Sequence, residues 1–225
     1  MTRRPIAYHS RSLDLPPAFR LTTLREVGDA FAHACANATE LGAGALVTVG
    51  RFDIAEFAVV LEPDEPLVSA RHVMYAGMLA LADALAALAP PQKAIKIGWP
   101  DAIRFDGRLI GGGRIAWPSD ATEAAPPEWL VFGAMIRMAA LTGDGSDRPA
   151  PGDPWVANPE RLAEGFARHI MRSLDRWRDA GFESIAGDYI SRLEADAQQN
   201  ANLMRPEALP VVPTWLAPET GEPCG

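Results

Sequence analysis

Residues 95–117, IKIGWPDAIRFDGRLIGGGRIAW, carry the strongest fold information in this chain of 225 residues. A Trp-Pro pair, Trp99-Pro100, follows a short apolar run, and Asp106-Gly107 separates two runs of strand-forming residues. Asp-Gly is typical of tight turns between antiparallel strands. Three consecutive glycines, Gly111 to Gly113, come soon after Arg108 in the second run. The segment therefore predicts a strand, a hairpin and a glycine-rich strand.

Helices and strands are expected on both sides of this segment. The order helix, strands, helix, strand meander and two helices indicates an α+β fold, with a mixed or antiparallel sheet packed with helices. Hydrophobic periodicity and the turn and cap signals predict helices over 24–39, 70–88 (capped by Ser69), 159–180 and 184–199, and strands over 45–49, 56–61, 94–97, 102–105, 108–117 and 130–138.

The length suits a single domain with one sizeable core. We expect an N-terminal arm over residues 1–14, a folded domain over 15–199 and a Pro-rich tail over 200–225 that is peripheral or disordered. The stretch 142–156 is rich in Gly, Pro and Asp, which predicts an exposed loop.

Composition excludes several classes of protein. The net charge of −8 leaves no basic surface for phosphates, so a nucleic-acid partner is not expected. No signal peptide or membrane-spanning run is visible, and we expect a cytoplasmic protein. The two cysteines, Cys35 and Cys224, provide neither a disulfide framework nor a metal site.

The Trp-Pro, hairpin and glycine order resembles the catalytic domain of the biotin/lipoate protein ligase family. In that family the run reads roughly Lys-Trp-Pro-Asn-Asp, then a hairpin, then a Lys just before a Gly pair. The resemblance extends over 15–193, through AGALVTVGRFD at 43–53 and LVFGAMIRM at 130–138. It implies the class II synthetase-like fold of this domain, without the DNA-binding domain that many biotin ligases carry.

The resemblance also implies a function. Such enzymes attach an acyl acid (biotin, lipoate or octanoate) to a lysine of a biotinyl or lipoyl carrier domain, through an acyl-adenylate made from ATP with Mg²⁺ or by acyl transfer. Sheet edges in the family often support dimers, so a homodimer is allowed, although no residue pattern speaks for one. Arg108 would be the catalytic cation. The substrate and nucleotide site would contain Gly50, Arg51, Trp99, Pro100, Asp101, Gly111, Gly112, Gly113, Gly133 and Arg137.

Several residues depart from the family pattern. The Arg-rich loop is reduced to Gly50-Arg51, followed at once by Asp53 and Glu56, which lowers the positive charge that two reacting anions need. Arg108 replaces the Lys after the hairpin and Gly98 the Lys before Trp99. In the later glycine strand, Met135 and Arg137 replace a Gly and an Asn.

Each site residue also has a structural interpretation. The glycines 111–113 indicate close approach of a ligand or of another part of the chain, or a β-bulge. Arg108 is either a cation for a carboxylate or phosphate or an exposed hairpin residue. Arg51 either binds a ligand or forms a surface ion pair. Asp101 either contacts a ligand or caps the turn, and Trp99 would wall the acyl pocket.

The same residues leave three hypotheses open. The first is a ligase or acyl transferase in which Arg108 and Arg51 hold the carboxylate and phosphate. The second is a non-catalytic member that binds an acyl ligand or a carrier protein, suggested by the shortened Arg loop and by Gly98. The third is a transferase with Cys35 as nucleophile, although its spacing from Phe31 and Val27 favours a buried core thiol.

Overall fold

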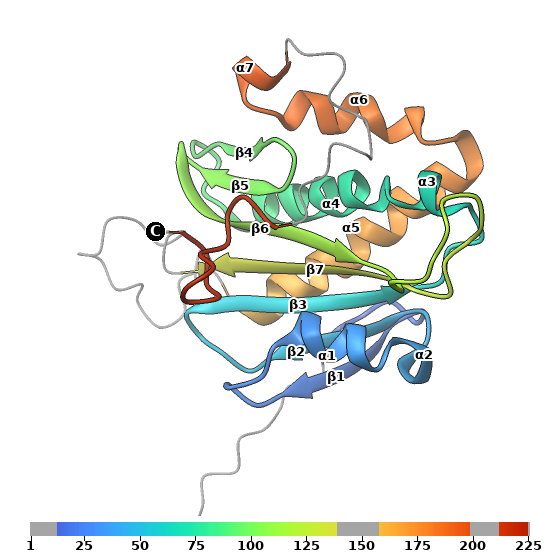
Figure 1. Cartoon of the computed structure of the whole chain (residues 1–225). Helices are drawn as coiled ribbons and strands as arrows, with labels where there is room; N and C mark the ends of the chain where they lie inside the picture. The colour runs from blue at the N-terminus through green and yellow to red at the C-terminus, as the bar shows by residue number, and fades with distance from the viewer. Residues whose placement is uncertain (1–12, 139–157, 199–211, 225) are drawn as a thin grey trace, which may run out of the picture.

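The computed structural model describes residues 13–138, 158–198 and 212–224. At its centre is a seven-stranded sheet with the order β1-β2-β3-β7-β6-β5-β4 (Figure 1). Neighbouring strands are antiparallel, apart from the parallel pair β1 and β2. The α+β fold with a mixed sheet is therefore confirmed. The strands are β1 (Arg20–Leu24), β2 (Ala45–Val49), β3 (Ile54–Leu61), β4 (Ile95–Gly98), β5 (Ala102–Phe105), β6 (Arg108–Ala116) and β7 (Leu130–Arg137).

The predicted hairpin joins β5 to β6. Asp106 and Gly107 both have positive φ, 51° and 80°, which is the backbone that a two-residue turn between antiparallel strands requires. Further along, the register shifts between Ile103 and Arg104, so the pair contains a bulge next to the glycines of β6.

Seven helices surround the sheet in the described residues: α1 (Ala30–Ala36), α2 (Ala38–Leu41), α3 (Leu67–Ala70), α4 (Val73–Leu88), α5 (Pro159–Ala180), α6 (Glu183–Arg192) and α7 (Ala195–Gln198). The limits of α5 are those predicted. The side chain of Asn158 accepts a hydrogen bond from the Glu160 N–H at 2.8 Å, and Gly181 ends the helix with φ 78°. No helix among the described residues has the length and hydropathy to cross a membrane.

Helices α4 and α5 cover one face of the sheet and form the main core with it. Helix α4 is buried almost all round, and its many alanines allow close packing. The Phe132 ring of β7 stacks on the Phe166 ring of α5 with centroids 5.4 Å apart. Gly77 of α4 faces the edge of the same Phe132 ring, because a Cβ at Gly77 would lie 2.3 Å from it.

The opposite face of the sheet is covered by α1 and by residues 212–224, here called the C-terminal segment (Figure 1). Successive residues of a strand point to opposite faces. Accordingly Phe132 packs on the helices, whereas Gly133 lies under the Phe31 ring of α1 and Met135 packs with Trp215 of the C-terminal segment. We call this second face the site face.

The predicted helix over 24–39 is wrong over residues 24–29, and the rest of it is divided at Asn37 into α1 and α2. Residues Arg20–Leu24 form β1, which pairs with β2, and the helix begins only at Ala30. Asp29 caps it by accepting a hydrogen bond from the Ala32 N–H at 2.8 Å. Val27, which the helical spacing had placed on the apolar face, is 97% exposed.

Two other helix predictions need correction. The predicted helix over 70–88 begins at Val73, and Ser69 lies within the separate short helix α3 instead of capping α4. The predicted helix over 184–199 is divided into α6 and α7, because the backbone becomes extended at Leu193 and forms a bridge to Ile97.

The expectation of a peripheral tail is wrong for the C-terminal segment. Trp215 is fully buried, and the segment folds onto itself through a bridge between Leu216 and Pro223. The remainder of the tail, the predicted loop 142–156 and residues 1–12 of the predicted arm lie outside the described residues.

A pair of helical glycines tests the packing of α4 against the sheet. Gly77→Ala should lower the free energy of unfolding by about 1–3 kcal/mol, because the added methyl group meets the Phe132 ring. Gly187→Ala in α6 is the matched control: its Cβ would meet no atom within 4 Å, so we expect a gain of up to about 1 kcal/mol. Chemical denaturation measures both. Equal effects of the two substitutions would contradict this packing.

Candidate functional site on the sheet

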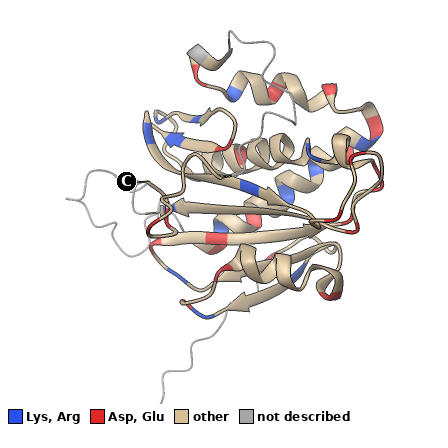
Figure 2. Cartoon of the chain, in the orientation of Figure 1, with Lys and Arg blue, Asp and Glu red and all other residues tan. Residues whose placement is uncertain are grey.

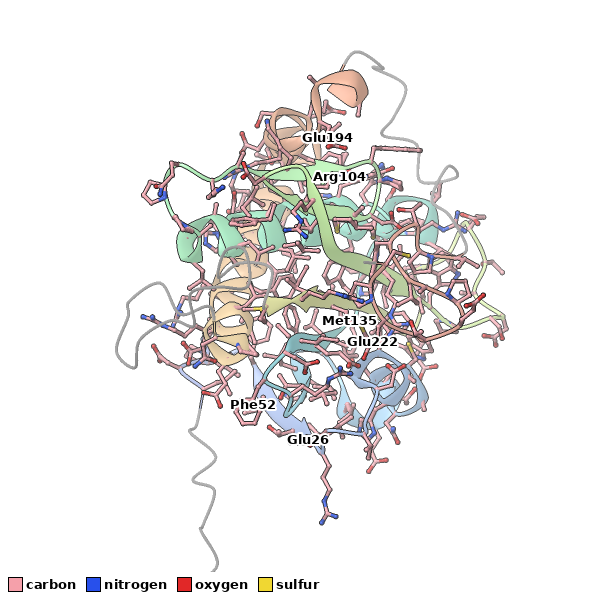
Figure 3. All side chains as sticks on the ribbon, turned by 90° about the vertical axis from the view of Figure 1, so that its left-hand side faces the viewer. Glu26, Phe52, Arg104, Met135, Glu194 and Glu222 are labelled. Atoms are coloured by element: carbon pink, nitrogen blue, oxygen red, sulfur yellow. The ribbon has the colours of Figure 1, made fainter. Side chains whose placement is uncertain are left out.

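The site face presents a block of three neighbouring strands. Cross-strand pairs place Glu56 of β3, Met135 of β7 and Gly112 of β6 in one row, and Gly133 and Arg114 in the next. Phe31 of α1 covers Gly133, and Trp215 covers Gly112. Figure 3 views the molecule from the left-hand side of Figure 1 and labels Met135 of β7 and Glu222 of the C-terminal segment. The polar groups of the site face therefore lie around the boundary between α1 and the C-terminal segment, which we call the seam.

Trp215 occupies the space over the glycines of β6. A Cβ on Gly112 would lie 2.4 Å from the indole ring and 2.0 Å from the Asp101 carbonyl oxygen. The indole Nε1–H donates a hydrogen bond to the Gly113 carbonyl at 2.9 Å. Buried aromatic N–H groups need such a partner. The absence of a side chain at Gly112 is what allows the ring to pack directly against β6.

Asp101 anchors the residue before this tryptophan. Its carboxylate accepts hydrogen bonds from the Thr214 N–H at 2.8 Å and from the Thr214 hydroxyl. Burial raises the pKa of Asp101, and the two hydrogen bonds from Thr214 oppose that shift. The sequence predicted that Asp101 either caps the turn or contacts a ligand. In the structure its carboxylate instead holds a distant segment of the chain.

Two arginines hold the other end of the C-terminal segment. Arg51 Nη2 lies 2.8 Å from the Glu222 carboxylate and 3.2 Å from that of Asp53. Arg137 Nη2 donates to the Pro223 carbonyl oxygen at 2.6 Å. The Nε of Arg137 is buried without a hydrogen-bond partner, and no ion pair of Arg137 is found in the described part of the chain.

On the α1 side of the seam, a carboxylate is buried in the sheet. Glu56 is 5% exposed and accepts a hydrogen bond from the Ala30 N–H at 2.7 Å. Burial raises the pKa of Glu56, while the Ala30 hydrogen bond and the Arg114 guanidinium oppose the shift. Arg114 lies over the Phe31 ring, 4.2 Å from its centroid, and pairs with Asp29 at 3.2 Å.

The structure brings several of the predicted site residues together. Arg51, Asp101, Gly112, Gly113 and Arg137 all contact the C-terminal segment. Gly133 lies nearby, under α1.

Other predicted residues lie apart from this group. Arg108 is exposed at the start of β6, opposite Phe105, whose ring is in the helix-side core. Trp99 packs against that same core instead of the site face. Pro100 accepts a hydrogen bond from the Tyr189 hydroxyl at 3.0 Å, and the Gly50 N–H donates to Leu24.

The glycines 111–113 approach parts of the chain itself. A Cβ on Gly111, which has φ 143°, would lie 1.9 Å from the Met135 carbonyl oxygen. One on Gly113 would lie 2.7 Å from the Met78 sulfur. Trp215 likewise approaches Gly112. Two of the three interpretations of these glycines, close approach by another part of the chain and a β-bulge, are therefore present in the structure. The third, close approach of a ligand, stays a prediction.

Sequence reasoning missed the residues that complete this site. Asp29 and Arg114 gave no motif, and Glu56 was considered only as an unfavourable charge or as an ion-pair partner of Arg51. Thr214 and Trp215 lie in a stretch whose prolines suggested a peripheral tail. An isolated tryptophan in such a stretch was the available signal, because a large apolar side chain is seldom left in water.

Cys35 lies on α1, half-buried, and packs against the small core between α1 and the sheet. Burial raises its pKa to about 11, with Arg114 lowering and Asp29 raising it. A nucleophilic cysteine needs a lowered pKa, so these surroundings favour the interpretation as a core thiol.

Charges of both signs are interleaved over the molecule (Figure 2). Within the described ranges, no group of three or more His, Cys, Asp or Glu residues could hold a metal ion. The site face has more carboxylates than guanidinium groups, because Asp29, Asp53, Glu56, Asp101 and Glu222 surround Arg51, Arg114 and Arg137.

Comparison with known proteins identifies a family for this arrangement. Residues 15–191 match the family described as biotin/lipoate A/B protein ligase. No curated protein sequence matches the chain.

Solved structures share the fold. A biotin protein ligase-like protein of unknown function from Silicibacter sp. TM1040 has a TM-score of 0.68 and 29% identity, covering 81% of each chain. Biotin protein ligase from Aquifex aeolicus, in complex with biotin and ATP, has a TM-score of 0.54 and 15% identity over 77% of this chain and 78% of that one. Biotin protein ligase from Leishmania major, in complex with biotinyl-5-AMP, has a TM-score of 0.53 and 17% identity over 80% and 83%.

The buried carboxyl group gives a prediction for stability. A carboxyl group whose pKa is raised in the folded state contributes stability below its ordinary pKa, and this contribution is lost as the pH rises through the raised value. Glu56→Gln keeps an acceptor for the Ala30 N–H but cannot ionise. Its free energy of unfolding should therefore fall less than that of the unsubstituted protein between pH 4 and pH 7. Parallel curves in urea denaturation at each pH would contradict the raised pKa.

The Cys35 thiol gives a second prediction. In a Cys224→Ser variant, iodoacetamide should react slowly with Cys35 at pH 7, because a thiol with a pKa of about 11 is almost entirely protonated there. The rate, measured by mass spectrometry, should rise about tenfold per pH unit from pH 7 to 10, as the thiolate fraction does. Rapid reaction at pH 7 would instead restore Cys35 as a candidate nucleophile.

Proposed function

The chain belongs to the biotin/lipoate A/B protein ligase family, and on this premise we propose that it binds an acyl acid on the site face and attaches it to a carrier-domain lysine. Biotin, lipoate and octanoate are the candidate acids. Attachment would proceed through an acyl-adenylate or by acyl transfer. All three acids combine an apolar body with one carboxylate, and the site face combines apolar and cationic residues.

Arg137 is the observation that carries this proposal. Its guanidinium group has a neutral carbonyl oxygen as partner at Nη2 and a buried Nε without any acceptor. A buried donor without an acceptor is destabilising, and more so when the group is charged. A carboxylate or a phosphate oxygen would supply the missing acceptor, since the planar guanidinium group binds such anions through two N–H groups.

The chemistry of adenylation explains why further cations are needed. The acid carboxylate attacks the α-phosphate of ATP and displaces pyrophosphate, so two anions must come together, and nearby positive charge lowers that barrier. Arg51 and Arg114 are further cations on the site face. ATP would enter as the magnesium complex, and the Aquifex aeolicus ligase in complex with biotin and ATP is the precedent for both substrates.

A non-catalytic function is the second candidate, and a specific observation favours it. Arg51 is paired with Asp53 and Glu222, and Arg114 with Asp29, so these two charges are already balanced within the chain. A member of this kind would bind the acid, or a carrier domain that bears it, without forming the adenylate.

ATP–pyrophosphate exchange separates the two candidates. Purified protein would be incubated with biotin, lipoate or octanoate, and binding of each acid would be measured in parallel by calorimetry. Exchange that depends on one acid would support the ligase and identify its substrate. Binding without exchange would support the non-catalytic function, and the absence of both would contradict the proposal.

Two arginine variants test the assignment within the site. Arg137→Ala should weaken acid binding at least about tenfold, because a charged hydrogen bond contributes about 1.5–3 kcal/mol. Arg108→Ala is the matched comparison. Family resemblance predicts a catalytic role for Arg108, whereas its side chain is exposed and lies apart from the contacts of the C-terminal segment. If Arg108→Ala abolishes binding and Arg137→Ala does not, the acid binds elsewhere than at Arg137.

A further inference from the structure

The C-terminal segment makes its polar contacts with residues that were predicted to bind a ligand. Thr214 contacts Asp101, Trp215 contacts Gly113, Glu222 contacts Arg51 and Pro223 contacts Arg137. Internal contacts tie the segment together as one unit. The Ala217 N–H donates to the Glu222 carbonyl oxygen at 2.8 Å, and the Cys224 N–H donates to that of Trp215 at 2.7 Å.

The segment also offers the chemical groups of an acyl acid. Trp215 is an apolar group packed with Met135, Ile54 and Ala102 on the site face. Glu222 provides a carboxylate for Arg51, and the Pro223 carbonyl oxygen is the hydrogen-bond acceptor for Arg137. An apolar body and oxygen acceptors for two arginines are what an acid or its adenylate would bring to the same place.

We propose that the C-terminal segment is an internal competitor of the ligand: Trp215 fills the space over Gly112 that the acid would take, and the acid binds when the segment leaves. This inference rests on the proposed function, because it assigns the regulation of that same site. The polar contacts that hold the segment are few and half-buried, apart from the buried hydrogen bond of the Trp215 indole, and the ion pair between Glu222 and Arg51 has partly exposed side chains.

Competition of this kind lowers the apparent affinity for the acid. When only a fraction of the molecules has an open site, the measured dissociation constant equals the intrinsic one divided by that fraction. A substitution that opens the site should therefore tighten binding, which is the opposite of what removing a binding residue does. This difference in direction distinguishes a competitor from a wall of the pocket.

The first test compares acid binding in matched variants. Dissociation constants for biotin, lipoate and octanoate would be measured by calorimetry in the full chain, in Trp215→Ala and in Val212→Ala. Trp215→Ala should bind the acid at least about tenfold more tightly. Val212→Ala is the control, because Val212 is 60% exposed in the same segment and should change nothing. Circular dichroism and melting curves would establish that each variant is folded.

Should Trp215→Ala fail to fold, Thr214→Ala provides the same test. It removes the hydroxyl hydrogen bond to Asp101 but leaves the indole in place, so a smaller change in the same direction is expected. If the folded variants bind the acid as weakly as the unsubstituted chain, or more weakly, the proposal that the segment competes with the acid is overturned.

The second test follows Trp215 in the unsubstituted protein. Its indole N–H resonance, assigned with Trp215→Phe, should lose its protection from solvent exchange as the acid is added, because the bond to the Gly113 carbonyl is broken. Binding with this N–H still protected would overturn the competitor and leave the proposed function intact. If no acid binds to the full chain, to Trp215→Ala or to Thr214→Ala, the proposed function is contradicted, and so is the proposal that the segment competes with the acid.

Discussion

Close approach of aromatic rings to the backbone of β6 and β7 is the constraint on which both faces of the sheet depend. On the helix side, the Phe132 ring needs Gly77 and Gly113 to lie without side chains. On the site face, Phe31 needs Gly133 and Trp215 needs Gly112. Because interiors are packed close to crystal density, a methyl group at any of these points moves a ring instead of filling a gap. The glycines therefore determine where α1, α4 and the C-terminal segment can lie.

The same packing shapes the chemistry of the site face. With α1 and the C-terminal segment in place, its carboxylates and arginines are turned toward each other, and Arg137 alone among the site-face arginines described has no carboxylate partner. Family membership gives the fold, whereas the charge balance of the site face is less favourable for bringing two anionic substrates together. A ligand and the C-terminal segment would use the same few groups, which connects the question of activity to the position of Trp215.

Local signals predicted the elements well, and contacts between distant residues were not predictable. Asp106-Gly107 and Asn158-Pro159 determine their turn and helix start through backbone preferences of neighbouring residues. Val27 misled the prediction because helical spacing extended through a stretch that forms β1 and a turn. The glycines of β6 indicated a close approach, but the partner, Trp215, is about a hundred residues away in the sequence, and no periodicity connects the two.

The order of synthesis gives the C-terminal segment a further meaning. Every strand and helix on which it rests is translated before it, so there is an interval in which they exist without it. During that interval the glycine strand is uncovered, and Arg51, Arg137 and Asp101 lack the partners that the segment later provides. A small molecule that meets the chain at that stage would have no rival for these groups.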